Sequence, residues 1–143
     1  MIFRLGYVAM TLNLVDSSPS GTITVKRFSN LSDDESRLYQ LRKITKKNLK
    51  NTLRILRYNK ASNIKVYRFT SKLVLLATHP LTESWDYIED FKKEFQDIGD
   101  FVKGNDFRVS AHPDHYTLLN SKSKDVIASS IKDLDYHVKL FEA

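Results

Sequence analysis

Residues 107–116 carry the side chains best suited to chemistry, because a short apolar run ends there in a cluster of polar groups. The cluster consists of His112, Pro113, Asp114, His115 and Tyr116. α/β proteins build their sites where a strand ends and a loop begins. The imidazole of His112 can bind a metal ion, although a lone histidine near a strand end is more often a hydrogen-bonded structural residue. Residue type alone leaves both interpretations of His112 open.

Polar side chains also follow two other apolar runs, at residues 64–69 and 73–77. These side chains are Arg68, Ser71, Lys72 and His79. If the strands are parallel, their carboxyl ends lie at one edge of a sheet, on the same side as the His112 loop. Guanidinium and ammonium groups bind phosphate, so Arg68 and Lys72 are candidate phosphate contacts.

The spacing of apolar residues predicts three strands, each followed by a helix. The strands are expected at residues 2–8, 64–69 and 107–110. The helices are expected from a capping signature at residues 32–35 to a stop at 59–63, from 82 to 104, and from Ser123 onward. This order predicts parallel βαβ units with right-handed crossovers.

The sequence leaves the interpretation of two features of the first strand and its loop open. Tyr7, at the end of that strand, can face a site or can pack in the core with its hydroxyl satisfied. Residues 10–31 show no helical period and predict a long loop, which is either a substrate-facing loop or a mobile surface insertion.

The composition excludes several classes of protein. The 143 residues suit one domain, and the absence of cysteine excludes disulfides and thiolate metal sites. No apolar run approaches the roughly 20 residues of a membrane span, and the start lacks the features of a signal peptide, so we expect a cytoplasmic protein with no membrane partner.

Positive charge is concentrated in one block. The net charge is +6, and residues 36–82 contain twelve Lys and Arg without any Asp or Glu. Such a block indicates either a polyanionic partner or the solvated face of a helix. Most of these residues fall on the outer face of the first predicted helix, which lowers their value as direct nucleic-acid contacts.

Three βα units can begin a doubly wound sheet or a (β/α)8 barrel, but three strands cannot close a barrel. The chain stops at Glu142 and Ala143, within or just after the last predicted helix. We therefore expect residues 1–143 to be the first part of something longer.

Several short motifs, taken in their order and spacing, resemble the UV damage endonucleases of the UvdE or UvsE type. The motifs are Arg4-Leu5-Gly6-Tyr7, Leu49-Lys50-Asn51-Thr52-Leu53, Tyr67-Arg68-Phe69-Thr70-Ser71-Lys72-Leu73, Ala77-Thr78-His79-Pro80, Arg108-Val109-Ser110-Ala111-His112-Pro113 and Leu134-Asp135-Tyr136-His137. The resemblance covers essentially the whole chain.

The resemblance implies a TIM-barrel DNA repair enzyme related to the endonuclease IV type of apurinic nuclease. Residues 1–143 would then be the first three βα units of a TIM (β/α)8 barrel, the N-terminal part of a single endonuclease domain. The enzyme would be a metal-dependent phosphodiester hydrolase that cuts immediately 5′ of pyrimidine dimers and 6-4 photoproducts. It would act as a monomer at full length, on double-stranded DNA with UV lesions.

The resemblance also implies roles for individual residues. Family members hold a cluster of divalent metals, commonly manganese, and His112 and His79 match histidines of that site. His115 and Tyr116 occupy the places of the pair that probes the duplex, although some members have glutamine where this chain has His115. Tyr7 matches a tyrosine near the lesion. DNA contacts are also expected from Arg68, Ser71 and Lys72.

The remaining metal ligands of the family belong to strands beyond residue 143, so we predict that the 143-residue chain alone has no nuclease activity. No catalytic acid, base or nucleophile is assigned. One alternative is a truncated, non-catalytic DNA-binding or vestigial module that keeps the basic face without the metals. Another is a sugar-phosphate isomerase-like barrel, since related barrels use similar metal ligands.

Overall fold

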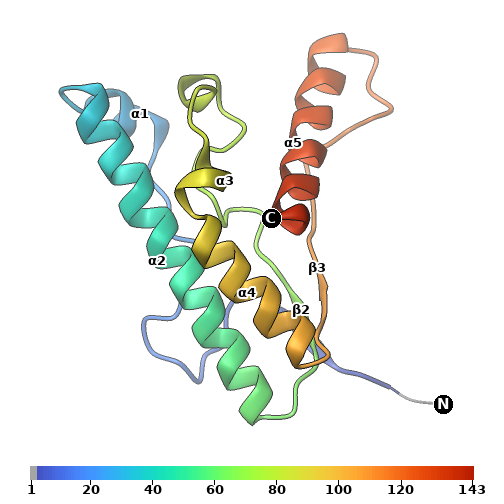
Figure 1. The fold of residues 1–143 in the computed structure, drawn as a ribbon. Coiled ribbons are helices and arrows are strands. Elements are labelled where there is room, and N and C mark those ends of the chain that lie inside the picture. The colour runs from blue at the N-terminus through green and yellow to red at the C-terminus, as the bar shows by residue number, and fades with distance from the viewer. Residues whose placement is uncertain (1–2) are drawn as a thin grey trace.

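The computed structural model describes residues 3–143, which form an α/β fold around a three-stranded parallel sheet (Figure 1). The strands β1 (Gly6–Val8), β2 (Val66–Arg68) and β3 (Arg108–Ser110) lie in that order. The predicted parallel order is confirmed, but each strand is shorter than predicted. Residue 2 of the first predicted strand lies outside the described residues.

The sheet has one covered face and one exposed face. Tyr67 is fully buried and lies in register with Tyr7 and Val109 on the covered side. Successive side chains of a strand point to opposite faces, so Arg68 lies on the other side, where it is exposed. Gly6 permits the close approach of β1 to β2, because a Cβ there would lie 2.3 Å from the carbonyl oxygen of Val66.

Helix α2 (Asp34–Ala61) packs on the covered face of the sheet beside α4 (Lys92–Gly104) (Figure 1). Asp33, one residue later than the predicted start, caps it by accepting a hydrogen bond from the Ser36 N–H at 2.7 Å. One side of the helix is buried, at Leu41, Thr45, Leu49, Thr52 and Leu56 among others. The helix ends at Ala61, within residues 59–63, where the sequence predicts its end.

The prediction of one continuous helix from residue 82 to 104 is wrong. The chain forms η1 (Pro80–Thr82), α3 (Tyr87–Asp90) and α4 (Lys92–Gly104), with a break at Phe91. The Phe91 ring is buried, and its centroid lies 6.3 Å from that of Trp85. The break thus lies where these two aromatic rings pack edge to face, at a point where periodicity predicted unbroken helix.

The predicted loop at residues 10–31 contains one short helix, α1 (Val25–Ser29), which periodicity missed. The preceding segment is held on α2 by two buried amides. Asn48 exchanges hydrogen bonds with the backbone of Gly21, and Asn51 donates to the carbonyl of Ser18 at 2.8 Å. This part of the loop is therefore packed against the domain.

Helix α5 (Lys124–Glu142) follows the loop after β3 and rises beside it (Figure 1). The predicted helix is confirmed, and its buried residues are Ser130, Tyr136 and His137. Along the predicted apolar stripe, Ile131, Val138 and Phe141 are each about half exposed, at 47, 53 and 51%. The Tyr136 hydroxyl accepts the Val74 N–H at 3.1 Å and ties α5 to the segment after β2. No helix in residues 3–143 is long and apolar enough to cross a membrane.

Candidate nucleic-acid interface

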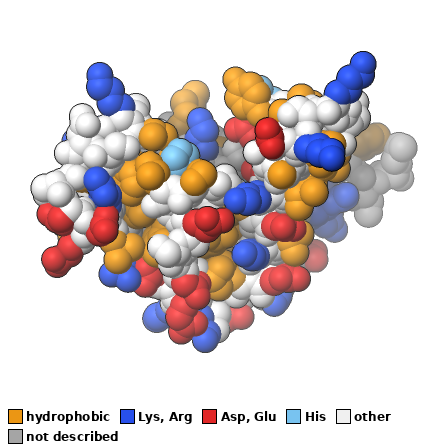
Figure 2. Space-filling model, turned by 90° about the horizontal axis from the view of Figure 1, so that it is seen from above, with side chains coloured by type: hydrophobic (Ala, Val, Ile, Leu, Met, Phe, Trp, Pro, Cys, Tyr) orange, Lys and Arg blue, Asp and Glu red, His pale blue; other side chains and the backbone are white. Residues whose placement is uncertain are grey.

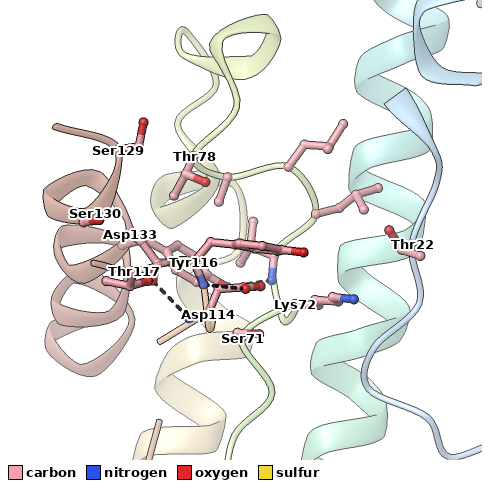
Figure 3. Close-up of a pocket in the computed structure, with 15 residues that line it drawn as sticks. Thr22, Ser71, Lys72, Thr78, Asp114, Tyr116, Thr117, Ser129, Ser130 and Asp133 are labelled. Atoms are coloured by element: carbon pink, nitrogen blue, oxygen red, sulfur yellow. Dashed lines mark hydrogen bonds between the residues drawn. The ribbon is translucent and has the colours of Figure 1, made fainter. Parts of the chain in front are cut away.

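A cleft of about 350 Å³ opens at the carboxyl end of the strands (Figure 3). Three parts of the chain line it. Ser71 and Lys72 come from the segment after β2, Asp114, Tyr116 and Thr117 from the loop after β3, and Ser130 and Asp133 from α5. Thr22, within the long first loop, also borders it. The cleft is thus rich in hydroxyl groups, with one ammonium group, two carboxylates and the two aromatic rings of Tyr116 and Tyr136.

His115 and Tyr116 form an exposed aromatic pair at the edge of this cleft. Their ring centroids lie 3.9 Å apart, and Tyr116 is 75% exposed. His115 Nδ1 also lies 3.0 Å from a carboxylate oxygen of Asp114, which orients the ring. The two ring planes are inclined by 42°. An exposed planar ring such as that of Tyr116 can stack on, or insert between, other planar groups.

The four-residue turn at 114–117 carries this pair. The Thr117 N–H donates to the Asp114 carbonyl at 2.9 Å, and the Tyr116 N–H donates to the Asp114 side chain at 3.3 Å. The turn is tied to α5, because Asp133 and Ser130 accept hydrogen bonds from its two ends. The sequence analysis missed Asp133 and Ser130. The available signal was their spacing with His137, which puts three polar side chains on one helix face.

The two candidate metal ligands lie outside this cleft. His112 is exposed, and its Nδ1 lies against the Pro113 carbonyl. His79 caps η1, where Nδ1 accepts the Leu81 N–H at 3.2 Å, and it faces a separate hollow of about 220 Å³ beside α5. Figure 2 looks onto this end of the molecule and shows histidine at its surface among hydrophobic, basic and acidic side chains.

Tyr7 and Arg68 also lie outside the cleft. The Tyr7 hydroxyl donates a short hydrogen bond to Asn59, and burial raises the pKa of Tyr7. This contact matches the packed interpretation of Tyr7 that the sequence left open. Arg68 is exposed on the open face of the sheet. The structure thus joins Ser71, Lys72 and Tyr116 in one cleft and places the other predicted site residues around it.

His137 of α5 is buried. The pKa of His137 is lowered, chiefly because burial disfavours the charged form, while Asp133 opposes that shift. Its Nε2 lies 3.9 Å from Asp133. A neutral, buried ring fits a structural role.

Residues 3–143 contain no group of three or more histidine, cysteine, aspartate or glutamate side chains placed to hold a metal ion. His112 and His79 can therefore serve a metal cluster only as part of a larger ligand set.

Comparison with known proteins identifies the chain. The sequence model described as UV-endonuclease UvdE matches residues 3–143. The chain belongs to the UvdE family. The resemblance drawn from the short motifs is thereby confirmed.

Curated relatives of the UvdE family agree over the whole chain. The UV DNA damage endonuclease of Halalkalibacterium halodurans is 42% identical over 142 residues, which cover 99% of this chain and 44% of that protein. The UV DNA damage endonuclease of Bacillus thuringiensis is 43% identical over an alignment of 145 residues, which covers 100% of this chain and 44% of that protein. The chain therefore spans less than half the length of these relatives.

A solved structure, the crystal structure of SacUVDE, has the same fold. It matches with a TM-score of 0.85 and 32% sequence identity, over 99% of this chain and 45% of that one. The cleft, the exposed aromatic pair and the surrounding histidines thus lie in a fold that this UvdE-family chain shares with SacUVDE.

Proposed function

We propose that this chain is part of a DNA repair endonuclease that cuts the phosphodiester 5′ of UV photoproducts in double-stranded DNA by metal-dependent hydrolysis. The observation that carries the proposal is the match to the UvdE family over residues 3–143, with relatives named UV DNA damage endonuclease. The structure adds the exposed aromatic pair beside a lysine-bearing cleft.

Residues 1–143 form, in this proposal, the first three βα units of a TIM barrel. Two observations support it. One face of the parallel sheet is covered by α2 and α4 while Val8 and Arg68 are exposed on the other, as expected for strands that would line a barrel interior. The likeness to SacUVDE covers 45% of that chain, which leaves room for further units.

The aromatic pair probes the duplex. The Tyr116 ring is planar and 75% exposed, with the His115 ring tilted against it, so it can enter a base step without unfolding its own loop. Unstacking a base step of B-form DNA costs roughly a few kcal/mol. This cost is lowest where damage has already disturbed the stack. Insertion therefore favours a lesion over an intact sequence.

Positive and polar side chains hold the DNA backbone around the lesion. Lys72 and Ser71 border the cleft beside Tyr116, and an ammonium group binds a phosphate as a point charge. Arg68 would contact phosphate from the sheet face, and Tyr7 would lie near the lesion.

His112 and His79 would contribute imidazole ligands to a divalent metal cluster, with manganese as the metal. Divalent ions supply charge neutralisation at the attacking and leaving oxygens of a phosphodiester. The described residues fit such a cluster only in part, because neither histidine belongs to a group of three or more potential metal ligands. The rest of the ligand set must come from outside residues 3–143.

The test is binding of the 143-residue chain to a labelled duplex with one pyrimidine dimer and to the same duplex without damage. We expect tighter binding to the damaged duplex and about a tenfold loss of that preference in Tyr116→Ala, since stacking on an aromatic ring is worth about 1–3 kcal/mol. Tyr39→Ala, which removes an exposed tyrosine from α2, is the matched control. Equal, salt-dependent binding to both duplexes would instead support a DNA-binding module that does not recognise lesions.

A further inference from the structure

Apolar packing does little to hold the tip of the loop after β3, defined here as His115 and Tyr116. Both side chains are 75% exposed, and their rings contact each other. The position of the tip therefore depends on polar contacts made by the residues on either side of it.

Two side chains of α5 accept hydrogen bonds from both sides of the tip. Asp133 Oδ2 accepts the Asp114 N–H at 3.2 Å and the Thr117 hydroxyl at 2.5 Å. Ser130 Oγ accepts the Leu118 N–H at 2.8 Å. The chain is thus fastened before and after the tip to one helix face, and Figure 3 shows Thr117, Ser130 and Asp133 side by side at the wall of the cleft.

The two anchors are themselves well held. Ser130 is 2% exposed and donates its hydroxyl proton to the Val126 carbonyl at 2.7 Å, which aims its lone pairs at the loop. The Asp133 side chain is 19% exposed and lies one turn from the buried His137. Side chains three and four residues apart share a helix face, so the anchors form one rigid platform.

We infer that Asp133 and Ser130 are positioning residues, which fix the tip so that Tyr116 stands beside the cleft. A carboxylate that accepts two hydrogen bonds holds the turn more strongly than a neutral group would. Neither side chain needs to touch DNA for this role. The inference rests on the proposed function only for the use of the tip, because the anchoring itself can be measured without DNA.

The first test is amide hydrogen exchange, read by NMR on the 143-residue chain. In Asp133→Ala we expect the Asp114 amide to exchange about tenfold faster, as the loss of a charge-assisted hydrogen bond implies. Ser130→Ala should do the same at the Leu118 amide. Asp133→Asn keeps one oxygen acceptor and should restore most of the protection, which general destabilisation would not do.

Asp135→Ala is the matched control, since it removes an exposed aspartate from the same helix. Buried amides of α2 report the global fold in each variant. Unchanged exchange at Asp114 and Leu118 overturns the inference, and so does an Asp133→Asn variant that behaves like Asp133→Ala. If Asp133→Ala unfolds, the Leu118 amide in Ser130→Ala still decides the question.

The second test repeats the duplex comparison with these variants. We expect Asp133→Ala to lose several-fold in preference for the damaged duplex and Asp133→Asn to regain it. If the unaltered chain shows no such preference, the proposed function fails while the exchange data still judge the anchors. If the preference survives in an Asp133→Ala variant whose loop exchanges faster, the positioning role is overturned.

Discussion

At the residue scale, Asn48 does more for the cleft than its place on a basic helix indicates. It is fully buried on α2, where its oxygen accepts the Gly21 N–H and its amide nitrogen donates to the carbonyls of Gly21, Lys72 and Leu73. One side chain therefore joins the long first loop to the segment that carries Lys72. Because neither segment has a regular partner for these backbone groups, the amide takes that place.

We expect Asn48→Ala to lower the free energy of unfolding by about 2–4 kcal/mol, since buried backbone groups would be left without partners. Urea denaturation followed by circular dichroism measures this loss. Lys47→Ala, at an exposed neighbouring position, should change the free energy of unfolding by less than about 0.5 kcal/mol. Equal effects of the two substitutions would contradict the role given to Asn48.

The periodicity argument did not find Asn48, Asp133 or Ser130, because it follows apolar residues and these are polar. A buried polar residue is explained only by the partner it meets, and here the partners are backbone groups of distant loops. The tip itself was predictable, because His115 and Tyr116 are adjacent and follow a strand.

At the scale of elements, Asp90 joins α2 to α3. Its carboxylate accepts two hydrogen bonds from the Arg42 guanidinium, at 2.7 and 2.8 Å, and one from the Trp85 indole N–H at 2.7 Å. The Arg42 hydrogen bonds lower the pKa of Asp90 below its usual range, the Trp85 hydrogen bond adds to this, and burial opposes it.

A lowered folded-state pKa means that this stabilisation is fully present above about pH 4, the value of a free aspartate, and is lost as the pH falls through the folded-state pKa. Trp85 is the single tryptophan, so its emission should change with a midpoint below pH 4. In Asp90→Asn this transition should vanish, and unfolding should cost about 1 kcal/mol less. Asp97→Asn, which affects a pair within α4, is the control. A transition that persists in Asp90→Asn would refute the assignment.

Most elements could be predicted from periodicity, and the misses have physical causes. The stripe of α2 was found because apolar residues along one side of the helix, from Leu41 to Leu56, are buried. The break at Phe91 was not, because it depends on how the Trp85 and Phe91 rings pack. The predicted stripe of α5 is half exposed at Ile131 and Val138, since in the described chain this helix faces the loop after β3 with its polar side.

At the scale of the whole molecule, the candidate site is distributed around one end of the sheet. Ser71, Lys72 and Tyr116 share the cleft, while His112 and His79 lie beside it and Tyr7 and Arg68 lie on the two faces of the sheet. The chain also covers only 44% of its curated relatives. Under the proposed function, this end of the fold would contact DNA, and its two imidazoles would need further ligands to hold a metal cluster.

The incomplete set of metal ligands predicts how the 143-residue chain behaves in an incision assay. With Mn²⁺ and an irradiated duplex, we expect no cleavage above the level of the protein-free control, because two imidazoles cannot hold a cluster that neutralises both oxygens of the scissile bond. The UV DNA damage endonuclease of Halalkalibacterium halodurans, assayed alongside, shows that the substrate can be cut. Cleavage by the chain that disappears in His112→Ala would contradict the prediction and place a complete metal site within these residues. Cleavage unchanged in His112→Ala would instead trace the activity to a contaminating nuclease, so the pair of assays decides whether the chain alone can do the chemistry.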